Sequence, residues 1–175
     1  MTFDCTFKIL EESPPSAPNI DDIKSYLRIT YDYDNEFLLK LRTRAIAYAE
    51  NFLRYSIIQK KVLLKDSPAP SLRAINCLLP LVYCSKVESV RGFNQKGGVD
   101  FDKDSYSISK DKSFLRLKIK DPLEKIKIVY YTSNLLTRYA WLQQGIMQHI
   151  SDMYDRKENY FALQSLYQPY RRILL

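Results

Sequence analysis

The chain has only one histidine, His149, and only three cysteines, Cys5, Cys77 and Cys84, among its 175 residues. The cysteines are odd in number and form no Cys-x-x-Cys pair, which argues against a disulfide framework and against a structural zinc site. Glycine is scarce as well, with four residues, unlike in low-complexity chains. We therefore expect a packed globular protein that folds without a metal or another cofactor.

Long apolar runs are also missing. No segment is apolar over the length of a membrane span, and residues 1–10 lack the basic start and the cleavage site of a secretory signal. We expect no membrane partner, and synthesis in a reducing cytoplasm with free thiols. Basic residues outnumber acidic ones, 27 to 20, and the formal net charge is +7. This surplus permits contact with nucleic acid, although the interspersed signs also fit a solvated surface.

No arrangement of catalytic residues is present, so we expect no enzyme and neither catalytic nor metal-binding residues. His149 has no recognisable nucleophile or ligand partner, which makes a histidine at the core edge or at an interface the default. The Gly92–Gly98 segment lacks the Lys and Ser/Thr of a phosphate loop and is read as a turn. The aspartates between Asp100 and Asp111 imitate calcium-loop spacing, but Ser105 replaces the turn glycine, so an acidic hairpin loop is the preferred alternative.

The apolar spacing predicts three main helices behind an extended arm. Residues 1–18 end in a proline-rich run that cannot hold a helix, which predicts the arm. Asn19 then offers a good N-cap, and stripes of apolar residues at three- and four-residue spacing follow. The expected helices are Ile20–Leu27, Asn35 to about Tyr55, and a last one from a cap within Thr132–Asn134 to about Arg156.

Between the second and third helices the pattern changes to alternating and β-branched residues. The candidate strands are Lys61–Lys65, Ile75–Leu79, Lys86–Phe93, Tyr106–Ser109, Phe114–Ile119 and Lys125–Tyr131. This order predicts an α+β fold with a mainly helical core, made of a short N-terminal helix and two long helices, and an inserted antiparallel β-sheet. We expect a single domain over residues 19–175, with the β-rich insertion at about residues 60–131.

Several short pieces of sequence then follow one another in a recognisable order. They are Ile23–Ile29 with its Tyr-Leu-Arg step, the acidic turn Asp32–Asp34, Ala45–Leu53 with its Ala-x-x-Tyr-x-Glu-x-Phe stretch, Leu79-Pro80, Val87–Val90, Ile128–Tyr131, Met153–Arg156 and Leu166–Arg172. Together they resemble the head-tail connector (adaptor) proteins of tailed bacteriophages, which also occur in prophages and gene transfer agents. The approach to the last helix departs from the family, because Ser133–Tyr139 stands where its members have glycine and proline.

The resemblance implies a structural virion assembly protein. Its members would form a homo-oligomeric ring of roughly twelve copies with heterologous contacts. The ring would dock to the portal protein, meet a tail-side adaptor or stopper protein, and surround DNA that passes through its channel without sequence preference. The protein would then be found at the head-tail junction of the virion, after synthesis in the cytoplasm of the bacterial host.

The two long helices carry more apolar surface than one seam needs, which predicts that part of it faces a neighbouring subunit. The candidate interface residues are Tyr48, Phe52, Tyr139, Ile146, Ile150, Met153, Tyr167, Tyr170, Arg171 and Arg172. The candidate contacts to channel DNA or a partner are Lys40, Arg42, Arg44 and Arg54.

Two alternatives stay open. The tyrosine-rich edges, Tyr26, Tyr31 and Tyr33 among them, could be either core residues or interface anchors. A basic nucleic-acid-binding module is the alternative function, because the chain is positively charged and its Lys and Arg residues alternate with aromatic ones.

Overall fold

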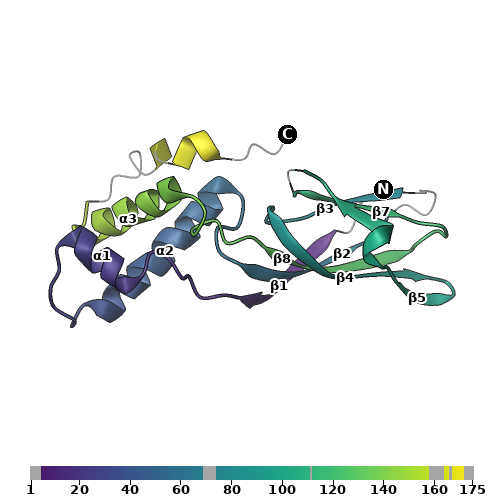
Figure 1. The fold of residues 1–175 in the computed structure, drawn as a ribbon, viewed down its shortest axis with the longest axis horizontal. Coiled ribbons are helices and arrows are strands. Elements are labelled where there is room, and N and C mark those ends of the chain that lie inside the picture. The colour runs from purple at the N-terminus through teal and green to yellow at the C-terminus, as the bar shows by residue number, and fades with distance from the viewer. Residues whose placement is uncertain (1–4, 69–73, 111, 158–163, 166, 172–175) are drawn as a thin grey trace. The chain divides into compact units, whose positions relative to one another are not determined.

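A computed structural model describes residues 5–68, 74–110, 112–157, 164–165 and 167–171 of the chain (Figure 1). The chain forms two compact units. The β unit comprises Met1–Ser13 and Gln59–Ser133, and the helical unit comprises Pro14–Ile58 and Asn134–Leu175. The single domain expected over residues 19–175 stays a prediction.

The β unit contains two antiparallel sheets. The described strands are β1 (Thr6–Glu12), β2 (Lys60–Asp66), β3 (Ala74–Leu78), β4 (Cys84–Asn94), β5 (Gly97–Asp100), β6 (Tyr106–Ile108), β7 (Phe114–Lys118) and β8 (Lys125–Thr132), with a short 3₁₀ turn at Lys103–Ser105. The five-stranded sheet has the order β1-β2-β8-β4-β5, and the three-stranded sheet has the order β3-β7-β6. All paired strands run antiparallel to their neighbours.

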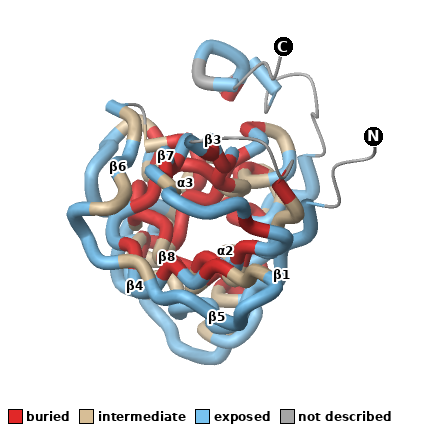
Figure 2. Tube along the Cα trace, turned by 90° about the vertical axis from the view of Figure 1, so that its right-hand side faces the viewer, coloured by how far each residue is buried: buried red, intermediate tan, exposed pale blue. Residues whose placement is uncertain are grey.

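The core of the β unit lies between the two sheets. Alternation along β2, β3, β7 and β8 turns one face inward, with Val62 and Leu64 from β2 meeting Leu115 and Leu117 from β7 in one buried cluster. In Figure 2 the trace of the β unit shows both buried (red) and exposed (pale blue) positions along its strands. Each such side chain contributes roughly 1.5–3 kcal/mol through burial, so this cluster is the main source of stability in the unit.

The helical unit consists of α1 (Ile20–Leu27), α2 (Asn35–Leu53) and α3 (Ala140–Tyr154), followed by a 3₁₀ turn at Gln168–Tyr170. The expected cap of α1 is confirmed: the Asn19 side chain accepts from the Asp22 N–H at 2.8 Å, and the Asp22 carboxylate accepts from the Asn19 N–H at 3.1 Å. Helix α2 packs on α3. Their shared core comes from the predicted stripes and includes Leu38, Leu41, Ala45, Leu142, Ile146 and Ile150.

The expected mainly helical core is wrong. In the part of the chain that the structure describes, three α-helices and eight strands contribute about equally, and the strands form two sheets instead of one inserted sheet. The physical reason is that the alternating residues of both sheets bury one another, so the strands build their own sandwich core and do not depend on the helices to cover them.

Three boundaries also differ from the expectation. Within the arm, Thr6–Glu12 pairs with β2, and β5 begins at Gly97, where the sequence indicated a turn. Helix α3 begins at Ala140 and not at Thr132–Asn134. The start is delayed because the backbone N–H groups of Leu135 and Leu136 donate to the Ile57 carbonyl, which holds both buried leucines outside a helix. None of the described helices combines the length and apolar content needed to cross a bilayer.

Candidate interaction surfaces

The described residues contain no cluster of three or more His, Cys, Asp or Glu side chains that could hold a metal ion. Two of the three cysteines are buried. Burial raises the pKa of Cys77 to about 12 and that of Cys84 to about 11, so neither thiol ionises near neutral pH to act as a nucleophile. His149 is also buried, and its ring meets the Tyr48 ring edge-on at 4.9 Å.

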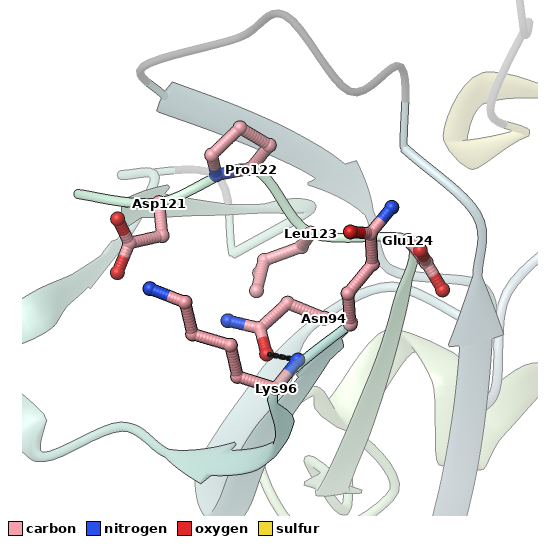
Figure 3. A pocket seen from close by; sticks show the side chains of 7 residues that line it. Asn94, Lys96, Asp121, Pro122, Leu123 and Glu124 are labelled. Atoms are coloured by element: carbon pink, nitrogen blue, oxygen red, sulfur yellow. Dashed lines mark hydrogen bonds between the residues drawn. The ribbon is translucent and has the colours of Figure 1, made fainter.

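A cavity of about 290 Å³ opens beside the β4–β5 turn (Figure 3). Its lining residues are Asn94, Gln95, Lys96, Asp121, Pro122, Leu123 and Glu124. The Asn94 side-chain oxygen accepts from the Lys96 N–H at 2.9 Å, which shapes the turn. The lining includes no serine, threonine, cysteine or histidine, so this cavity offers no hydroxyl, thiol or imidazole group for catalysis.

An aromatic patch is exposed on the helical unit. Tyr26, Tyr31, Tyr33 and Phe37 keep 38%, 37%, 78% and 46% of their surface accessible. The rings of Tyr31 and Tyr33 are stacked, with centroids 4.0 Å apart and planes 4° from parallel. We call these four residues the aromatic patch. Clustered exposed aromatic side chains are typical of protein–protein interfaces.

Hydrogen bonds to α3 hold the aromatic patch in place. The Tyr26 hydroxyl donates to the Gln148 side-chain oxygen at 2.9 Å, and the hydroxyls of Tyr31 and Tyr154 share a hydrogen bond at 3.1 Å. Tyr154 also donates to the Asp34 carboxylate at 3.0 Å. These hydrogen bonds hold Tyr26, Tyr31 and Asp34 in place before any partner binds, which reduces the entropy lost on binding.

Phe37 is the member of the patch that the sequence reasoning missed. It lies in the first turn of α2, beside Leu38, which belongs to the apolar stripe. A signal was available: Phe37 lies four residues before Leu41 and therefore continues the apolar stripe into the first turn of the helix. The structure shows that Phe37 is exposed, with its ring 6.3 Å from that of Tyr154.

The predicted interface residues differ widely in exposure. Tyr139 and Arg171 are exposed, Tyr48, Phe52 and Met153 are half-buried, and Ile146, Ile150 and Tyr167 are buried within their own chain. Arg172 and the side chain of Tyr170 lie outside the described residues. Contact between any of these residues and a neighbouring subunit stays a prediction.

The C-terminal segment packs on α2 and α3. The Tyr167 ring lies 6.4 Å from the Phe52 ring, and a Cβ built on Gly145 of α3 would come within 3.0 Å of Tyr167. The Arg171 guanidinium lies over the Phe52 ring, 5.1 Å from its centroid. Tyr167 and Arg171 therefore cover part of the surface of the two long helices, at Phe52 and at Gly145.

The four predicted basic residues of α2 and its C-terminal end do not form one continuous exposed surface. Lys40 forms an ion pair with Glu36 at 2.6 Å, one turn earlier, and Arg44 and Arg54 are exposed. Arg42 is half-buried, donates to the Pro18 carbonyl at 3.0 Å, and has its pKa lowered by burial. Only Lys40 and Arg44, four residues apart, lie next to each other on an exposed side of the helix.

His149 should make the helical unit sensitive to pH. Burial lowers its pKa, and the charge of Asp152 offsets part of this effect. Below about pH 6.5 the unfolded chain therefore binds a proton that the folded chain does not, so stability falls as the pH drops. We expect a lower urea midpoint, followed by far-ultraviolet circular dichroism, at about pH 5.5 than at about pH 7.5.

The variant His149→Gln should lose most of that pH dependence, since His149 is the only histidine in the sequence. Asp152→Asn serves as the matched control and should increase the drop, because it removes the charge that favours protonation. An unchanged pH dependence in His149→Gln would contradict the assignment.

Neither a family model nor a curated protein sequence matches the chain. Solved structures do match its fold. A chain in the neck of an empty gene transfer agent particle, computed with C6 symmetry, superposes with a TM-score of 0.73 at 14% identity, over 97% of both chains. The chain shares the fold of this solved chain. A chain in the virion of a native gene transfer agent particle superposes with a TM-score of 0.72 at 14% identity, over 97% of this chain and 96% of that one.

The neck of the native particle, computed with C12 symmetry, gives a TM-score of 0.71 at 14% identity over 97% of both chains. These matches confirm, at the level of the fold, the resemblance to connector proteins that the sequence indicated. The match includes residues of both the β unit and the helical unit, since it covers 97% of this chain.

Proposed function

We propose that the protein is a head-tail connector subunit of a phage-like particle, a structural component of the virion neck with no enzymatic role. The observation that supports this most is the fold match to neck chains over 97% of the chain. Its site at the head-tail junction, after synthesis in the bacterial host, is part of the same proposal.

The proposed assembly is a ring of roughly twelve copies, in which each copy presents one surface to the preceding subunit and a different one to the next. The aromatic patch is the proposed anchor for the second copy, because it is pre-ordered and its apolar rings would become buried there. Among the predicted residues, Tyr139, Met153 and Arg171 would add contacts, since they keep accessible surface.

The ring is proposed to dock to a portal protein on one side and to a tail-side adaptor or stopper protein on the other. DNA passing through the channel would be a non-specific partner. Lys40 and Arg44 are the predicted basic residues whose positions on α2 would allow them to face it. Such contacts would be made to phosphates and would weaken with salt.

Native mass spectrometry of the purified full chain, alone and with portal-bearing heads, tests this function. We expect a closed oligomer or a stoichiometric ring on the heads, and attachment of tails only when the protein is present. A chain that stays monomeric at all concentrations and does not bind the heads would contradict the proposal. If such a monomer bound nucleic acid, the alternative of a basic nucleic-acid-binding module would be supported instead.

A further inference from the structure

The outer face of the five-stranded sheet is strongly basic. The register of the strands places on this one face the cationic side chains Lys8, Lys61, Lys65, Lys86, Arg91, Lys125 and Lys127 and the acidic side chains Glu11, Glu88 and Asp100. We call these residues the basic sheet face. Its cations come from β1, β2, β4 and β8, which are far apart in the sequence, so no single segment revealed the cluster.

The acidic residues of this face are already paired near its margins. Glu11 and Glu88 both pair with Lys61, at 3.5 and 3.0 Å, and Asp100 pairs with Arg91 at 3.4 Å. The exposed cations Lys8, Lys65, Lys86, Lys125 and Lys127 have no acidic partner within 4.0 Å among the described residues.

Three cations stand side by side in one row across the sheet. Lys65 of β2 is directly opposite Lys127 of β8, and Lys127 is directly opposite Arg91 of β4. Neighbouring strands are only about 4.7–4.9 Å apart, and like charges directly opposite one another destabilise a sheet. An anion that lies across the row would relieve this repulsion.

The aromatic side chains of the face already hold cations. The Phe93 ring has the Lys127 amine 4.8 Å and the Arg91 guanidinium 5.7 Å from its centroid, and the Tyr131 ring has the Lys61 amine at 5.5 Å. Rings covered in this way are poorly placed to stack on unpaired bases, as binding of single strands requires. The cations themselves are held outward, where phosphates can reach them.

We propose that the basic sheet face binds the phosphate backbone of duplex DNA without sequence preference. A protein partner fits less well, because the cores of protein interfaces are depleted in lysine and this face has Lys65 and Lys127 near its middle. Phosphate contacts, in contrast, are made by lysine and arginine. The biological meaning of the inference rests on the proposed neck function, while the binding itself needs only one folded chain.

The experiment compares the full chain with Lys65→Gln/Lys127→Gln, using fluorescence anisotropy of a labelled duplex of mixed sequence over about 50–200 mM salt. The double variant should weaken binding by roughly tenfold or more near 0.1 M salt and reduce the slope of log K against log salt by about 2. Because it also removes like charges from one row, its melting temperature should rise by roughly 1–4 °C. Weaker binding with higher stability is not expected from damage to the fold.

The matched control is Arg116→Gln/Lys118→Gln on β7 of the three-stranded sheet, which removes the same number of exposed charges. We expect it to change duplex binding by less than about twofold and to leave the melting temperature the same or lower, because the hydrogen bond from Arg116 to the Asn76 side-chain oxygen is lost. Equal losses of duplex affinity in the two double variants would overturn the proposal, as would duplex binding that does not weaken with salt. Tighter binding of a single strand, or equal competition by polyglutamate, would also overturn it by assigning the face to another ligand.

Ring formation is followed on the same samples by native mass spectrometry. A chain that binds duplex DNA without forming rings would contradict the neck function and leave the basic sheet face as assigned. A chain that forms rings but does not bind DNA would contradict only the inference about the face.

Discussion

Replacing Tyr33 and Phe37 by alanine is expected to dissociate the proposed ring, raising the subunit dissociation constant by roughly a hundredfold or more. Exposed aromatic anchors commonly contribute about 2 kcal/mol or more each on truncation, and each 1.4 kcal/mol is a tenfold change. Among the large hydrophobic residues described in the helical unit these two are the most exposed, and their removal leaves no cavity in the core. The change should therefore affect assembly and not folding, as native mass spectrometry and thermal melting would show.

Phe114→Ala is the matched control, because Phe114 is a similarly exposed aromatic residue, at 41%, in the β unit. It should leave the oligomer intact. If the control dissociates the oligomer as strongly as the double variant, the aromatic patch has no special role. If the double variant assembles normally, the proposed anchor is wrong, although the neck function could rest on another surface.

Tyr167→Ala is expected to lower the free energy of unfolding by about 3–5 kcal/mol, the usual cost of truncating a buried aromatic side chain. Tyr167 is fully buried, lies against Phe52, and comes within 3.0 Å of a Cβ built on Gly145. Because these contacts are within one chain, the loss should not depend on protein concentration. Urea denaturation at two concentrations measures both points.

Tyr167→Phe is the matched control, because it keeps the aromatic side chain and removes only the hydroxyl. The Tyr167 hydroxyl is buried and has no hydrogen-bond partner among the described residues. Its removal should therefore be neutral or slightly stabilising, since an unsatisfied buried polar group is costly. A loss in Tyr167→Ala that appears only in the assembled protein would show that Tyr167 acts mainly between subunits, as the sequence alone suggested.

The sequence by itself determined the local elements. Apolar stripes at helical spacing correctly indicated α1 and α2, and Asn19 correctly indicated the first cap. Alternation correctly indicated β2, β3, β4, β6, β7 and β8 to within a few residues. The order of short motifs was enough to indicate the resemblance to connector proteins, which the solved structures confirm at the level of the fold. These features depend on residues close together in the chain, so one sequence contains them.

Only the tertiary structure decided how the elements share their buried surface. Periodicity shows that a strand has an apolar face but not what covers it, so two sheets that bury one another were mistaken for a single sheet inserted into a mainly helical core. The pairing register of the strands creates the basic sheet face, because Lys65, Arg91 and Lys127 become neighbours only when β2, β8 and β4 pair. Packing likewise buried Tyr167 and left Phe37 exposed. Long-range pairing of this kind depends on the whole chain at once, and local sequence patterns do not encode it.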